Sequence, residues 1–93
     1  MPTFRYRFVE TGASVYEVWV EMIAGLTDVQ TLHFREGTEE FLTAFSPPPG
    51  TVFKTPWSPV VIVDDIDEVT IRNGQNVDIA VGVFDPTLPD PGP

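Results

Sequence analysis

Hydrophobic and polar residues alternate along two stretches near the beginning of the chain. In residues 3–10, Phe4, Tyr6 and Phe8 occupy every second position, and a second alternation of apolar and polar residues follows in 15–23. A period of two is typical of β-strands that turn one face toward a core. The pattern therefore predicts two consecutive strands.

One register matches both faces of these strands as an antiparallel hairpin. If Phe8 lies opposite Tyr16, apolar residues face one another along one side of the pair. On the other side this register brings Arg5 opposite Trp19, where a guanidinium group can lie over an indole ring. We therefore predict a hairpin with a short loop that contains Gly12.

A helix over about residues 15–26 is an open alternative. Ser14 and Glu17 form a capping box, and apolar residues recur at helical spacing as far as Leu26. The β-branched residues of the same stretch favour a strand, because their χ1 angles are restricted in a helix. The alternative would make the fold α+β instead of all-β.

A second hairpin is predicted from residues 29–35 and 40–46, with Gly37 in its turn. Prolines then interrupt regular pairing in residues 47–59. Residues 51–55 can therefore form only a short strand within a proline-rich loop.

The last third of the chain contains strand patterns in residues 60–63, 68–72 and 76–84. A three-residue loop between the last two patterns would pair Ile71 with Val77. We therefore predict a third hairpin in this register, with Val77 and every second residue after it on the core face.

The last of these strands differs in residue size between its two faces. Val77, Ile79 and Val81 alternate with the small residues Ala80 and Gly82. Small residues leave room for close approach of a neighbouring layer, as in a central strand of a sheet. The strand is therefore predicted to lie in the middle of the sheet.

Together these patterns predict about seven short strands with turns at intervals of about 8 to 12 residues. Such spacing is typical of a compact antiparallel β-sandwich or small barrel. We expect one domain over residues 1–84. The proline-rich residues 85–93 cannot join a β-ladder and are predicted to form a C-terminal arm.

Composition adds constraints on stability and location. The chain has 93 residues and no cysteine, so neither a disulfide nor a thiolate metal site stabilises it. A small domain without such links is often stabilised by its neighbours in an oligomer. The N-terminus has no apolar stretch of signal-peptide length, and we expect synthesis in the cytoplasm.

The charge balance narrows the class of partner. The formal net charge is -9, from 14 acidic and 5 basic side chains. Such a chain repels phosphate backbones and anionic lipid surfaces, so we expect neither direct nucleic-acid binding nor membrane binding. A protein partner with a basic surface is compatible with this charge.

Candidate chemistry is sparse. His33 is the single imidazole of the sequence, and its strand pattern places it on a polar face, which favours a surface histidine over a catalytic base. No nucleophile elbow, phosphate loop, dinucleotide fingerprint or zinc spacing occurs. We therefore predict that the protein is not an enzyme and has no cofactor.

One acidic corner is the best candidate for a divalent cation, because hard cations prefer several carboxylate oxygens. It comprises Asp64, Asp65, Asp67 and Glu68. The corner lacks the spacing of a twelve-residue calcium loop, so a solvated turn is the favoured interpretation and no metal is predicted.

Large apolar residues near prolines are the predicted partner contacts. Phe45, Phe53 and Trp57 lie on or beside the proline-rich segment, where a stiff backbone loses little entropy on binding. The alternative is that these three rings close one end of the sandwich. Trp19 beside Arg5, and Leu88 in the arm, are further candidate contacts.

These features favour a non-enzymatic structural or assembly protein that acts through protein–protein contacts as a homo-oligomer or in a larger assembly. We expect a small virion component, such as a capsid decoration or stabilising protein or a head or tail accessory protein. A compact β domain, an extended arm and no chemistry suit such a part. The alternative is a stand-alone acidic binding module or inhibitor of a basic-surfaced protein.

Overall fold

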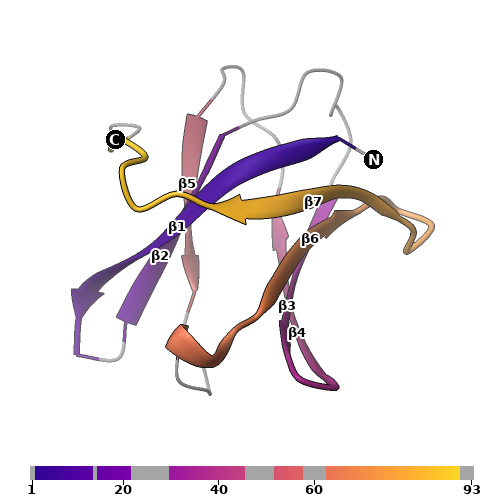
Figure 1. The fold of residues 1–93 in the computed structure, drawn as a ribbon, viewed down its shortest axis with the longest axis horizontal. Coiled ribbons are helices and arrows are strands. Elements are labelled where there is room, and N and C mark those ends of the chain that lie inside the picture. Colours follow the sequence, from indigo (N-terminus) through magenta and orange to yellow (C-terminus); the bar gives the residue numbers. More distant parts are fainter. Residues whose placement is uncertain (1, 14, 22–29, 46–51, 58–62, 91–93) are drawn as a thin grey trace.

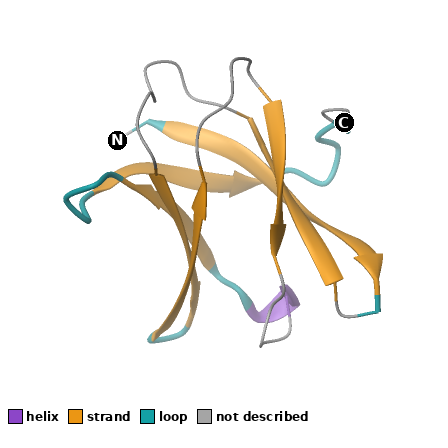
Figure 2. Cartoon of the chain, turned by 180° about the vertical axis from the view of Figure 1, so that it is seen from behind, coloured by secondary structure: helices purple, strands orange, loops and turns teal. Residues whose placement is uncertain are grey.

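The computed structural model describes residues 2–13, 15–21, 30–45, 52–57 and 63–90. These residues form seven strands in one sheet, with order β4-β3-β6-β7-β1-β2-β5. The sheet curls into a half-barrel (Figures 1 and 2). The strands are β1 (Thr3–Gly12), β2 (Val15–Glu21), β3 (Gln30–Glu36), β4 (Glu39–Phe45), β5 (Val52–Trp57), β6 (Glu68–Arg72) and β7 (Asp78–Phe84).

The all-β prediction is confirmed. Val15–Glu21 is a strand, and residues 22–26 of the alternative helix lie outside the described residues. A 3-10 turn, η1 (Val63–Asp65), precedes β6, whereas most of the strand predicted at residues 60–63 is not described. Within the described part of the chain, no helix has the length and apolar composition needed to span a bilayer.

The sheet is mixed, where the sequence predicted an antiparallel one. Among the described strand pairs β1 and β7 are parallel, and the other neighbours are antiparallel. Their pairing joins the β1–β2–β5 half of the sheet to the β3–β4–β6 half. The predicted central position of β7 is confirmed by the strand order.

The first hairpin is shifted by two residues from the predicted register. Phe8 pairs with Val18 instead of Tyr16, and Arg7 instead of Arg5 lies opposite Trp19. A shift of two leaves every side chain on its predicted face, because the period of a strand is two. The loop is shorter than predicted, because pairing extends as far as Gly12 opposite Val15. An irregularity between Glu10 and Gly12 accommodates this extension.

The second hairpin agrees with its prediction. Strands β3 and β4 pair from Gln30 opposite Phe45 to Glu36 opposite Glu39. Gly37 has a φ of 61° in the turn, a conformation that glycine adopts without steric cost. Strand β5 includes Pro56 and is the last strand in the order of the described sheet, where no further described strand needs the missing N–H.

The predicted register of the β6–β7 hairpin is wrong by two residues at Arg72, which pairs with Asp78, and by three residues at Ile71, beyond an irregularity in the pairing. Ile71 pairs with Ala80 instead of Val77, which exchanges the two faces of β7. Ala80 is fully buried, whereas Val77 and Val83 are 54% and 50% exposed. Val83 therefore does not face the core as predicted, whereas Ile79, which is half-buried, packs against the buried cluster.

Close packing explains this exchange. A Cβ added at Gly82 would lie 2.8 Å from Cδ1 of Tyr6 and 2.9 Å from Cζ of Phe4. The curl of the sheet brings these rings over β7, and only small residues fit beneath them. The close approach predicted from Ala80 and Gly82 is real, but it occurs on the core side.

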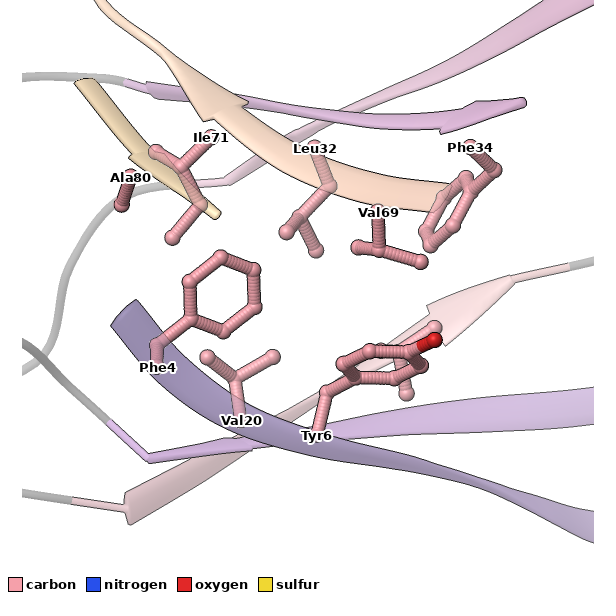
Figure 3. Packing of buried hydrophobic residues seen from close by; sticks show 9 residues of the cluster. Phe4, Tyr6, Val20, Leu32, Phe34, Val69, Ile71 and Ala80 are labelled. Carbon is pink, nitrogen blue, oxygen red and sulfur yellow. The ribbon is translucent and has the colours of Figure 1, made fainter. Parts of the chain in front are cut away.

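The core lies inside the curl, between the two halves of the sheet. Figure 3 shows Phe4, Tyr6 and Val20 opposite residues of the β3–β6 half. Burying each such side chain contributes about 1.5–3 kcal/mol. The cluster of buried residues comprises Phe4, Tyr6, Val18, Val20, Leu32, Phe34, Val69, Ile71 and Ala80.

Residues 85–90 of the predicted arm lie across the outer face of β1, β2 and β5. The amide of Asp85 donates to the carbonyl of Tyr6 at 2.9 Å, which continues the course of β7. Leu88 is fully buried, and Asp90 pairs with Lys54 at 3.3 Å. This segment therefore packs on its own sheet, while residues 91–93 lie outside the described residues.

Candidate functional site

A pocket of about 540 Å³ opens between the β1–β2 hairpin, the segment around η1 and the end of β7. We call it the acidic aromatic pocket. Phe84, at its mouth, is 57% exposed. The described lining residues are Tyr6, Phe8, Glu10, Tyr16, Asp64, Ile66, Asp67 and Phe84.

The inner wall of the pocket is aromatic and continues the core. Tyr6 contacts Phe8 edge to face, with ring centroids 5.4 Å apart, and it contacts Phe84 in the same way at 5.9 Å. Parallel pairing of β1 with β7 sets Tyr6 beside Phe84. Burial raises the pKa of Tyr6, so its phenol is neutral at physiological pH. The wall is therefore a pre-formed surface of neutral rings.

Carboxylates from two segments line the rest of the pocket. Glu10 comes from the end of β1, and Asp64 and Asp67 come from the segment around η1. The hydroxyl of Tyr16 donates to Oε2 of Glu10 at 3.0 Å, which holds this carboxylate at the pocket. That hydrogen bond, followed by burial and the charges of Glu10 and Asp64, raises the pKa of Tyr16.

No positive charge balances these acids among the described lining residues, none of which is Lys or Arg. Arg35, a nearby base, contacts Glu40 at 2.5 Å and Glu68 at 3.6 Å. Its pKa is raised by the hydrogen bond to Glu40 and, among lesser causes, by the charge of Asp67. The backbone of Asp67 is fixed by its amide, which donates to the carbonyl of Arg35 at 3.0 Å. The pocket therefore combines apolar ring surface with three carboxylates, and no basic residue belongs to its described lining.

The four acids of the predicted cation corner separate in the structure. Asp64 and Asp67 line the pocket, Asp65 is exposed and does not line it, and Glu68 pairs with Arg35. Among the described residues, no group of three or more His, Asp and Glu side chains is arranged to hold a metal ion. All four acids are exposed, and the solvated-turn interpretation stays a prediction; Asp64 and Asp67 also line a pocket that the sequence did not indicate.

The predicted partner contacts have different positions. Trp19 is buried on the outer face with the guanidinium of Arg7 4.9 Å from its ring, so the predicted pairing with Arg5 is wrong. Leu88 is buried in the same region, and its carbonyl accepts a hydrogen bond from Nη1 of Arg7 at 3.2 Å. Both contacts are made within the chain, and a partner contact by either residue stays a prediction.

The remaining three predicted contacts lie on the edge strands of the sheet. Phe45 ends β4, and the backbones of Phe53 and Trp57 pair with Val20 and Tyr16 of β2. Their side chains lie outside the described part of the structure. Their predicted role therefore stays untested.

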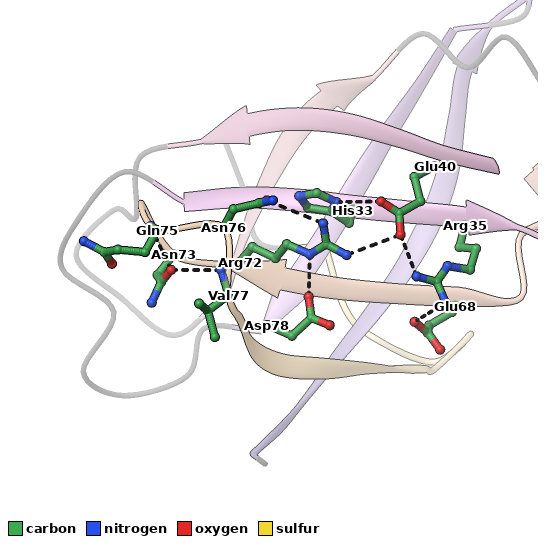
Figure 4. Close-up of polar contacts among 10 residues, drawn as sticks. All are labelled: His33, Arg35, Glu40, Glu68, Arg72, Asn73, Gln75, Asn76, Val77 and Asp78. Carbon is green, nitrogen blue, oxygen red and sulfur yellow. Dashed lines mark hydrogen bonds and ion pairs between the residues drawn. The ribbon is translucent and has the colours of Figure 1, made fainter. Parts of the chain in front are cut away.

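His33 lies on the predicted outer face but is only 5% exposed, so the expectation of a surface histidine is wrong. Arg72 and Glu40 lie beside it (Figure 4). Its Nδ1 is 3.7 Å from Oε2 of Glu40, and no described residue lies within hydrogen-bond geometry of this nitrogen. Burial, and then the charge of Arg72, lower the pKa of His33. The imidazole is therefore neutral at physiological pH, on the face of the sheet opposite the pocket wall.

Several pocket residues were not predicted as site residues. The alternation assigned Tyr6, Phe8 and Tyr16 to a hairpin core, and nothing singled out Glu10 or Phe84. The sequence does contain a local signal: Glu10 directly follows the apolar pair Phe8 and Val9, and Asp85 directly follows Phe84. The convergence itself depends on the parallel pairing of β1 with β7, which no local pattern reveals.

No family model matches this chain, and neither a curated protein nor a solved structure matches it.

Proposed function

We propose that this protein is a non-enzymatic binding module that contacts a basic-surfaced protein partner through the acidic aromatic pocket. The observation that carries the proposal is the composition of the pocket: four aromatic rings and three carboxylates, with no basic residue among the described lining. Aromatic rings supply contact area at low entropic cost, and carboxylates in a lining without a described basic residue select a positive partner.

The overall charge supports the same partner. A net charge of -9 attracts a basic protein over distance and accelerates its association. The same charge opposes a symmetric contact between two copies at this end, because the acids of both pockets would meet. The pocket therefore favours a different protein as partner over a homo-oligomer joined at this end.

A structural role in a virion, as a decoration or accessory protein, is the second candidate function. Exposed apolar residues on the outer face favour a further protein contact: Val83 of β7 and Leu42 of β4 are 50% and 59% exposed. Sedimentation of the full chain over a range of concentrations tests self-association. If Val83→Ser leaves an observed oligomer unchanged, that face is not its interface.

Titration of the isotopically labelled full chain with short peptides of positive, zero and negative net charge tests the binding role. We expect only the basic peptide to shift the amide resonances of Phe84, Ile66 and Asp67, with an affinity that falls as salt is added. A neutral peptide that binds equally well, or shifts confined to another surface, would contradict the proposal.

A further inference from the structure

We propose that the acidic aromatic pocket binds the guanidinium group of an arginine side chain carried by the partner protein. The proposal rests on the proposed function and names the ligand of its site. The pocket offers both surfaces that a guanidinium group needs, namely ring faces and carboxylate oxygens.

The first surface is the aromatic wall. Tyr6 meets Phe8 and Phe84 edge to face, and Phe84 is more than half exposed at the mouth. A guanidinium group is planar and weakly hydrated, so it stacks on such a ring at small desolvation cost. The ammonium group of lysine is compact and strongly hydrated and gains less from the same wall. The aromatic lining therefore favours arginine.

The second surface is the set of carboxylates. Glu10 is held by Tyr16, and Asp64 and Asp67 approach from the segment around η1. The five N–H donors of a guanidinium group form a fork that carboxylates accept in pairs. The raised pKa of Tyr16 has the charges of Glu10 and Asp64 among its causes, consistent with a negative field at this position.

The outer face of the same hairpin already holds a guanidinium group in this way. The guanidinium of Arg7 lies 4.9 Å from the ring of Trp19, and its Nη1 donates to the carbonyl of Leu88. A ring and an oxygen acceptor therefore suffice to position arginine on this sheet. The pocket has more rings and stronger acceptors, and no arginine of the described lining fills it.

The size of the pocket indicates what carries the arginine. Its volume of about 540 Å³ falls in the range of small-molecule sites, about 300–1,000 Å³. A guanidinium group occupies only part of such a space, so the aliphatic stem of the side chain and adjoining peptide atoms enter with it. The ligand is therefore an arginine in an accessible peptide segment.

Three peptides that differ only at one central residue test the proposal against the labelled full chain. The central residue is arginine, lysine or citrulline, the last being a neutral shape analogue of arginine. We expect the arginine peptide to bind tightest and the citrulline peptide to bind about tenfold more weakly, since charge and ring contact act together. Shifted resonances should cluster at Tyr16, Ile66, Asp67 and Phe84.

Two neighbouring acids of η1 provide a matched pair of variants. Asp64 lines the pocket and Asp65 does not, although both are exposed and occupy the same turn. We expect Asp64→Asn to weaken the arginine peptide several-fold and to leave the citrulline peptide unchanged. Asp65→Asn removes the same charge and should change neither affinity by more than about twofold.

The possible outcomes distinguish the identity of the ligand group from the proposed binding function. Equal binding of lysine and arginine peptides at the pocket would overturn the guanidinium assignment and leave the proposed function standing. Equal binding of citrulline and arginine would overturn the charge-based recognition. If no basic peptide shifts the pocket resonances, both the inference and the proposed function fail.

Discussion

The β1–β2 hairpin has an aromatic surface on each face, and the two surfaces differ in what covers them. On the outer face, Trp19 is buried beneath Arg7, and Leu88 of the C-terminal segment is buried with them; we call these three residues the outer cluster. On the inner face, the acidic aromatic pocket leaves Phe84 exposed. The chain thus supplies its own guanidinium and leucine on one face, and none of the described lining residues supplies a cation on the other.

The difference assigns distinct roles to the two surfaces. Burying a leucine contributes about 1.5–3 kcal/mol, while exposed ion pairs such as Lys54–Asp90 contribute about 0–1 kcal/mol each. The outer cluster therefore stabilises the attachment of the C-terminal segment mainly through Leu88. The inner wall of the pocket belongs to the core through Tyr6 and Phe8, whereas Phe84 and the three carboxylates are the part to which we assign a ligand.

Gly82→Ala should have the largest effect, because the inner face has no space at β7. The new Cβ would lie 2.9 Å from the carbonyl oxygen of Val69, a backbone atom that cannot rotate away. We expect a loss of about 3 kcal/mol in the free energy of unfolding, measured by urea denaturation. Gly74→Ala is the control, since nothing lies within 4 Å of its added Cβ. Equal stabilities would contradict the packing described for β7.

Leu88→Ala tests the outer cluster. We expect a loss of about 2 kcal/mol in stability, limited by the free energy with which residues 85–90 bind the sheet. Indole fluorescence should shift to the red as Trp19 becomes accessible. Leu42→Ala, at an exposed position, should change stability by less than about 0.5 kcal/mol. If both variants behave alike, the segment does not depend on its buried leucine.

These packing features mark the limit of what the sequence predicts. The alternation of apolar and polar residues located most of the strands. Phe4, Tyr6 and Phe8, for example, share one face of their strand whatever the register of the hairpin. The β6–β7 register failed because large residues were assumed to face the core. Ala80 and Gly82 face it instead, beneath rings that only the curled sheet brings there.

The pocket was beyond sequence reasoning for a related physical reason. Its aromatic residues are indistinguishable from core residues in the alternation of β1 and β2. Phe84 joins Tyr6 through a parallel pairing between the two ends of the chain, and Asp64 enters from a turn far from both in sequence. The sequence did identify the acidic corner. Which of its acids line the pocket and which pair with Arg35 depends on the tertiary fold.

Phe84→Ala should distinguish the pocket from the outer cluster. Because more than half of Phe84 is exposed, we expect less than about 1 kcal/mol of lost stability. Binding of the arginine peptide should weaken several-fold, because the ring at the mouth is lost. Calorimetric titration measures the affinity for the arginine peptide. Leu88→Ala is the comparison, since it should lower the stability of the fold and leave peptide binding nearly unchanged. The reverse ranking would exchange the roles assigned to the two surfaces.

The smallest expected effect is the pH dependence of the C-terminal attachment. Hydrogen bonds from the hydroxyl and amide of Thr87, and then Arg5, lower the pKa of Asp85 in the folded state. Its stabilising contribution is therefore present above the unfolded pKa of about 3.9 and disappears as the pH falls through the folded value. Asp85→Asn should reduce stability at neutral pH, and the difference from the natural chain should vanish in acid. A difference independent of pH would assign the effect to the turn and not to the charge.

The most direct test of the central claim is the set of intermolecular nuclear Overhauser effects between the arginine peptide and the full chain. The account predicts contacts from the δ-methylene protons of the peptide arginine to the ring protons of Phe84 and Tyr16, and none to the indole of Trp19. Contacts to Trp19 in place of Phe84, or no contact with any ring of the pocket, would contradict it.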